Sequence, residues 1–185
     1  MNIRLLAAAF VVVLAPVSSR AADDENPYKN SKVGDFAIYK MSMKVAGMDL
    51  GGTITQSVAA KSDKEVTLKV TGKINGMDVP ETEQKIDITK AFDPTKLANQ
   101  TGTDVKVEKG KEGKEKIKVM GKEYESTWTS YKVKGKANGV DIDSDMKVWL
   151  AKDLPAAMGK MEMTMTVMGM KIEMTMDLSE TGSKK

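Results

Sequence analysis

The sequence predicts a mainly β protein, an antiparallel meander of about ten strands that forms a curved half-barrel or an open barrel. Apolar and polar residues alternate over long stretches, which is typical of strands with one face buried and the other in water. Five dipeptides that end in glycine separate these stretches, and such dipeptides are typical of tight hairpin turns. They are 46–47, 75–76, 120–121, 138–139 and 168–169.

The first 21 residues are typical of a cleavable signal peptide. Arg4 precedes an apolar run over 5–17, and small residues, Ser19 and Ala21, lie just before a cut ahead of Ala22. The run is too short for a membrane span. We therefore expect an exported protein, in the periplasm or outside a bacterial cell, whose mature chain has no transmembrane segment. Its parts are a flexible leader over 22–33, a single β domain over 34–179 and a tail over 180–185.

Composition argues against several classes of function. The chain has no cysteine and no histidine, which removes disulfides, thiol nucleophiles, Ser-His-Asp catalysis and histidine-ligated metals. Both arginines, Arg4 and Arg20, lie in the predicted signal, so the mature chain is nearly neutral and its basic side chains are all lysines. We expect no nucleic-acid binding, no cofactor and no enzymatic activity.

The hairpin over 128–149 allows its register to be derived from the sequence. A two-residue turn at Asn138-Gly139 places three lysines opposite three aspartates and Trp128 opposite Trp149. Tyr131 then faces Met146 on the other side of the sheet. The same rule places a lysine opposite an acid beside three more turns. The predicted charge pairs are Lys136 with Asp141, Lys134 with Asp143, Lys132 with Asp145, Lys44 with Asp49, Lys73 with Asp78, and Lys118 with Glu123.

The segment over 90–116 has the weakest strand pattern. Asp93-Pro94 suits the start of a helix, so we expect one short helix near 93–100. The run of Lys, Glu and Gly that follows, over 107–116, is interpreted as a solvated loop or an edge hairpin. Strand pairing is expected to resume at 117–119, before the turn at 120–121.

Residues 160–178 form the most regular hairpin, and its apolar positions are mostly methionine. A turn at 168–169 places the apolar side chains of both strands on one face. Methionine is flexible and polarizable, so this face could adapt to varied apolar shapes. The residues that we predict to bind a ligand are Met41, Met43, Tyr131, Met146, Met161, Met163, Met165, Ile172, Met174 and Met176.

The sequence also suggests two possible metal sites, one for calcium and one for Cu(I). Asp141, Asp143 and Asp145 suggest calcium, but Met146 and Lys152 stand where an EF-hand loop needs glycine and glutamate. The facing lysines also account for the three carboxylates, so we predict no metal there. Methionine thioethers could hold Cu(I), although the usual histidine co-ligand is missing.

A family resemblance rests on Gly34, Asp35, Phe36 and Tyr39, which open the meander after the signal peptide. This pattern resembles the LolA-like periplasmic lipoprotein carriers and the mycobacterial lipid-carrier half-barrels, as well as small secreted bacterial proteins of unknown function. The resemblance implies a curved antiparallel sheet around a hydrophobic cavity and assigns no site residue here.

Together these patterns predict an exported protein that holds a lipid or another apolar molecule on the methionine-rich face of a concave sheet. Two alternatives stay open. The first alternative is a structural or protein-interaction β domain with a filled core. The second is a Cu(I)-binding protein.

Overall fold

The computed structural model describes Asn26, residues 28–90, 104–137, 140–151, Leu154, 158–167 and 169–184. In this part of the chain nine antiparallel strands form one sheet, and no helix is present that could cross a membrane. The predicted helix over 93–100 lies outside the described residues. The strands are β1 (Asp35–Val45), β2 (Met48–Lys61), β3 (Glu65–Ile74), β4 (Met77–Asp87), β5 (Asp104–Val119), β6 (Lys122–Ala137), β7 (Val140–Leu150), β8 (Met158–Val167) and β9 (Met170–Ser183).

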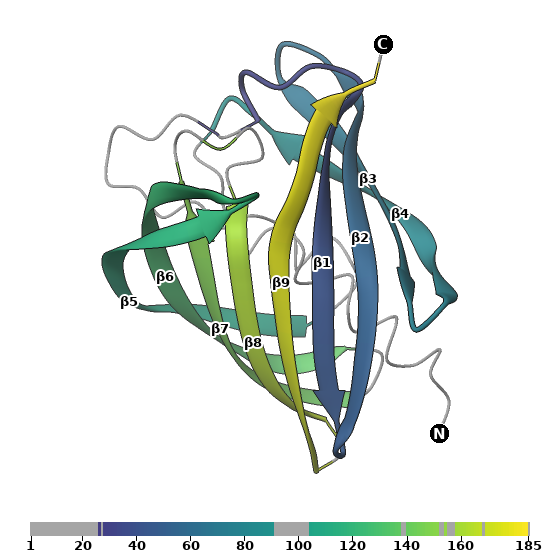
Figure 1. Ribbon diagram of the computed structural model, residues 1–185, viewed down its shortest axis with the longest axis vertical. Helices are drawn as coiled ribbons and strands as arrows, with labels where there is room; N and C mark the ends of the chain where they lie inside the picture. The colour runs from purple at the N-terminus through teal and green to yellow at the C-terminus, as the bar shows by residue number, and fades with distance from the viewer. Residues whose placement is uncertain are drawn as a thin grey trace.

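The order of the strands joins two meanders through the first and last strands. The sheet runs β4-β3-β2-β1-β9-β8-β7-β6-β5, so β1 pairs with β9 in the middle while β4 and β5 form the two edges. The sheet is curved but not closed into a barrel (Figure 1). The predicted open architecture is therefore confirmed, with nine strands described rather than about ten. Strand β9 continues to Ser183, into the predicted tail.

Three of the predicted turns have the backbone of a type I′ hairpin. Both central residues have positive φ at Ala46-Gly47 (50° and 81°), Asn75-Gly76 (49° and 81°) and Met120-Gly121 (50° and 80°). Positive φ is easy for glycine and tolerable for asparagine, but it is strained for methionine. Residues 138, 139 and 168 lie outside the described residues.

The predicted register is confirmed throughout. Strands β6 and β7 pair Lys132 with Asp145 and Trp128 with Trp149, and strands β8 and β9 pair Met163 with Met174. The pairs beside the other turns also lie opposite one another, namely Lys44 with Asp49, Lys73 with Asp78 and Lys118 with Glu123.

The Lys/Glu/Gly run does not form a solvated loop but belongs to a hairpin at the edge of the sheet, the second of the two predicted forms. Residues 104–119 form one long edge strand, β5, paired along its length with β6. The register shifts between Lys109 and Glu112, and the Ser130 hydroxyl accepts a hydrogen bond from Lys111 N (2.8 Å) at this irregularity. Charged residues have low strand propensity, but an edge strand gains hydrogen bonds from one neighbour and keeps its charges in water.

The alternation of side chains divides the sheet into two faces. We call one the methionine face; it carries Met41, Met43, Met146, Met161, Met163, Met165, Met174 and Met176. The opposite face, which we call the charged face, carries the lysine-acid pairs. Cross-strand pairing keeps each set on its own side.

The end of the β5–β6 hairpin curls over the charged face. Strands β5 and β8 are separated by two strands in the sheet, yet a methyl group placed on Gly159 would come within 2.5 Å of Ile117 and 3.2 Å of Val119. Figure 1 shows this hairpin end lying across the upper ends of β7 and β8. The curl buries Ile117 and Val119 on an otherwise polar side of the sheet.

Candidate functional site: the methionine face

The methionine face is built from rows of side chains that run across the strands. In the central row Met43, Met174, Met163 and Met146 stand on β1, β9, β8 and β7, each directly opposite the next, and Tyr131 follows on β6. Directly opposed residues have Cβ atoms about 4.5–5.5 Å apart. The four thioethers are therefore close neighbours.

Two flanking rows complete the patch. Met41, Met176 and Met161 lie opposite one another on one side of the central row, and Ile172 and Met165 lie on the other side. All ten residues predicted to bind a ligand thus belong to one continuous surface that spans five strands.

The ten side chains are buried. Their exposed fractions run from 0% for Met161 and Met176 to 6% for Met146. They belong to one hydrophobic cluster together with other residues of the same face, including Ile54, Val70 and Leu178. An apolar surface of this size is stable only when it is covered, because each buried methionine contributes about 1.5–3 kcal/mol.

Two hydroxyl groups on this face were missed from the sequence. Tyr39 is fully buried and Ser144 is 2% exposed, and neither hydroxyl has a hydrogen-bond partner. Burial raises the pKa of Tyr39. The alternation of side chains along a strand could have placed them on this face. Tyr39 lies two residues from Met41 on β1, and Ser144 lies two residues from Met146 on β7. A buried hydroxyl without a partner is costly, so these two groups are candidates to contact a polar atom of a ligand.

The charged face carries an open hollow of about 650 Å³. Its lining includes Lys44, Lys132, Lys147, Glu162 and Glu173. Many charges on this face are already paired, as in Lys132–Asp145, Lys134–Asp143 and Lys136–Asp141, each at 3.6 Å. Among the described residues no three acidic side chains gather to hold a metal ion. The hollow is thus lined by charged and hydroxyl side chains of this face, and four of the predicted ligand-binding residues, Tyr131, Met146, Met163 and Met174, also border it.

A tryptophan pair interrupts this polar surface. Lys147 places its Nζ 4.1 Å from the centre of the Trp128 ring and 4.2 Å from that of Trp149. Glu115 accepts a hydrogen bond from the Trp149 indole nitrogen. The Trp128 ring lies over Gly113, its directly paired residue on β5. These contacts explain why Trp149 is only 2% exposed on a face that is otherwise wet.

Burial also affects the charges next to the tryptophans. Strand pairing places Asp177 opposite Lys160, and partial burial raises the pKa of the Asp177 carboxyl while the lysine charge lowers it. The hydrogen bond from Lys160 to Glu162 raises the pKa of the lysine, so its charge is retained. The pattern is that of a structural ion-pair network.

Comparison with known proteins gives a fold but no family. No protein-family model matches the sequence, and no curated protein matches it. A solved structure from Bacteroides fragilis, described as an exported protein with a YmcC-like fold, has a TM-score of 0.51 at 10% identity. The alignment covers 82% of this chain and 97% of that one, so the two share a fold.

A second solved structure is a domain of an outer membrane lipoprotein-sorting protein from Vibrio parahaemolyticus. The alignment has 9% identity and covers 82% of this chain and 85% of that chain. Its TM-score of 0.26 is too low to carry an argument.

Proposed function

We propose that this protein is an exported, non-catalytic binding protein of the cell envelope that holds a lipid or another apolar molecule on its methionine face. The observation that carries the proposal is the face itself, where eight methionines from β1, β7, β8 and β9 form one surface. Export is supported by the signal-peptide pattern over 1–21 and by a structural neighbour that is itself described as exported.

The choice of side chain favours a ligand over simple filling of a core. A core that needs one fixed packing is better specified by Leu, Ile, Val and Phe, whose rotamers are well defined. Methionine has three rotatable bonds and can repack around different guests. The hydroxyls of Tyr39 and Ser144 lie on the same face and would gain a partner from a polar atom of an amphiphile.

Two alternatives rest on specific observations. The low exposure of the methionines, together with a hollow on the opposite face, favours a filled core and a structural or protein-interaction role. The row of four directly opposed thioethers favours Cu(I), a soft cation that prefers sulfur ligands.

The decisive experiment measures binding of an apolar fluorescent probe to the mature protein, alongside native mass spectrometry of protein purified from its own envelope. Met163→Gln keeps the length of the side chain but places an amide on the methionine face. Met48→Gln is the matched control, since Met48 is 52% exposed at a hairpin turn. We expect probe binding and a co-purifying apolar molecule with the unmodified protein and with Met48→Gln, and at least tenfold weaker binding with Met163→Gln.

The alternatives give different results in the same assays. A protein that is free of bound molecules and does not bind the probe would overturn the proposal in favour of a filled core. Replacing the central row with leucine (Met43, Met146, Met163 and Met174) preserves apolar volume but removes all four sulfurs. Apolar binding should survive this change, whereas binding of Ag(I) or Cu(I) through the row would be lost.

A further inference from the structure

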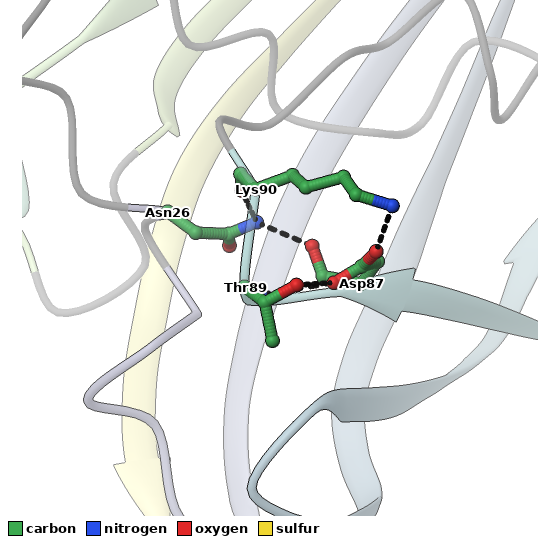
Figure 2. Close-up of polar contacts among 4 residues, drawn as sticks. All are labelled: Asn26, Asp87, Thr89 and Lys90. Carbon is green, nitrogen blue, oxygen red and sulfur yellow. Dashed lines mark hydrogen bonds and ion pairs between the residues drawn. The ribbon is translucent and has the colours of Figure 1, made fainter.

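The segment before β1 is attached to the end of β4 by one asparagine. Asn26 is 4% exposed, and its side-chain amide donates hydrogen bonds to the carbonyl oxygens of Asp87 and Lys90, both at 3.1 Å. Figure 2 shows this clamp. Contacts of Asp87 also hold the segment from Asp87 to Lys90 at the end of β4. Its carboxylate accepts a hydrogen bond from the Thr89 hydroxyl (2.5 Å) and forms an ion pair with Lys90 (2.9 Å). These contacts, the Thr89 hydrogen bond first, lower the pKa of Asp87 to about 2, so the carboxylate keeps its charge at any physiological pH.

A second attachment comes from β2. Lys61 at the end of that strand donates from Nζ to the carbonyl oxygens of Lys29 and Ser31, each at 2.6 Å. Gly34 N donates to the carbonyl oxygen of Val58 (3.0 Å). We call Asn26 and residues 28–33 the strap, because polar contacts hold this segment across the ends of β2 and β4.

The strap carries one aromatic side chain onto the methionine face. Tyr28 packs against a second apolar cluster that continues this face over β2, β3 and β4; its buried members are Val58, Val66, Leu68, Ile86 and Ile88. The Tyr28 hydroxyl is enclosed although the residue as a whole is partly exposed. Burial raises the pKa of Tyr28.

Tyr39 lies on the side of the methionine face next to this cluster: its partner on β2 is Ile54, and Val70 of the methionine face is the same-side neighbour of Leu68 of the cluster on β3. Tyr39 stands on β1 one position along the face from Met41 and opposite Leu178 on β9, and its hydroxyl is buried without a partner. We infer that the strap is a movable closure which, through Tyr28, covers this end of the methionine face and controls access to it. The inference rests on the proposed function, because it identifies where an apolar ligand enters the face.

The strap can open without the sheet unfolding. Side chains of Asn26 and Lys61 bind it to the ends of β4 and β2, whereas each inner strand is held by backbone pairing along both sides. Segments with few buried contacts near a terminus open at a lower free energy than the strands of the sheet. Release of Asn26 would leave every backbone pair of the sheet in place.

A first test measures the accessibility of Tyr39 without any ligand. The mature protein is treated with tetranitromethane, and nitration at Tyr39 is followed by peptide mass spectrometry. We expect slow nitration in the unmodified protein and roughly five- to tenfold faster nitration in Asn26→Ala, which loses two hydrogen bonds. Asn30→Ala is the matched control, since Asn30 is exposed in the same segment. Tyr28→Ala removes the covering ring itself, and thermal unfolding identifies any variant whose sheet is damaged.

A second test measures the kinetics of the apolar probe on the same variants. The association and dissociation rates should both rise in Asn26→Ala and Tyr28→Ala, with little change in Kd, because a closure alters the barrier more than the bound state. Unchanged Tyr39 nitration and unchanged probe rates in both folded variants would overturn the inference. Faster nitration without probe binding in any variant would overturn the proposed function and retain the strap as a closure of this face.

Discussion

The two faces of the sheet are built from the same strands, yet the environments of their side chains differ sharply. On the methionine face Met163 is 3% exposed and lies between methionines on β7 and β9. Its neighbour Thr164 points to the charged face, between Asp145 and Glu173. Two consecutive residues of β8 thus lie in a dry apolar environment and in a wet, charged one. The same substitution should therefore cost much more stability on the methionine face than on the charged face.

The largest difference is expected from the same lysine placed at both positions. Met163→Lys buries an unpaired ammonium and should lower the free energy of unfolding by roughly 3–5 kcal/mol. Thr164→Lys meets two facing carboxylates and should change it by less than about 0.5 kcal/mol. Urea denaturation of both variants measures the contrast. Similar losses for the two would mean that the assignment of the faces is wrong.

A smaller effect should appear where the charged face is itself packed. A methyl group on Gly113 would lie 2.6 Å from ring atoms of Trp128, and that ring is fixed by Lys147. Gly113→Ala should therefore destabilise the protein by about 1–3 kcal/mol, as overpacking does, and change the tryptophan fluorescence. Gly51→Ala adds the same methyl group in open space on β2 and should be close to neutral. A neutral Gly113→Ala would show that the tryptophan pair is loosely held.

The smallest effect belongs to the exposed ion pairs. Lys134 and Asp143 are 3.6 Å apart and more than half exposed. A double-mutant cycle with alanine at both positions should give a coupling of about 0.2–1 kcal/mol, which falls as salt is added. A coupling above 2 kcal/mol would indicate that this part of the charged face is shielded from water.

Much of this contrast could be predicted from the sequence because strand parity is a local property. Once Asn138-Gly139 was taken as a two-residue turn, the register placed lysines against aspartates and Tyr131 against Met146, and the structure confirms it. The ten candidate residues lie on one surface for the same reason. Tyr39 and Ser144 share that parity, but neither belongs to the hairpins of 128–149 and 160–178 as an apolar position, so the apolar pattern alone did not mark them.

Other features depend on contacts that a local pattern does not contain. The run over 107–116 left a solvated loop and an edge hairpin as alternatives because Lys, Glu and Gly have low strand propensity, and pairing of β5 with β6 decides for the hairpin. The strap depends on Asn26 reaching Asp87 and Lys90, more than sixty residues away. The curl of the β5–β6 hairpin depends on a glycine, Gly159, two strands away in the sheet.

The pairing of β1 with β9 has a consequence for the time at which the protein can fold. The Ser179 hydroxyl bonds to the Ile38 carbonyl oxygen across 141 residues, and β1 has no β9 partner until nearly the whole chain is present. Contacts of such long range slow folding. A chain that emerges from its N-terminus can assemble the β1–β4 meander early, but β1 then remains an open edge. The central seam of the sheet, between β1 and β9, therefore closes last, and the two meanders become one sheet only when the final strand is present.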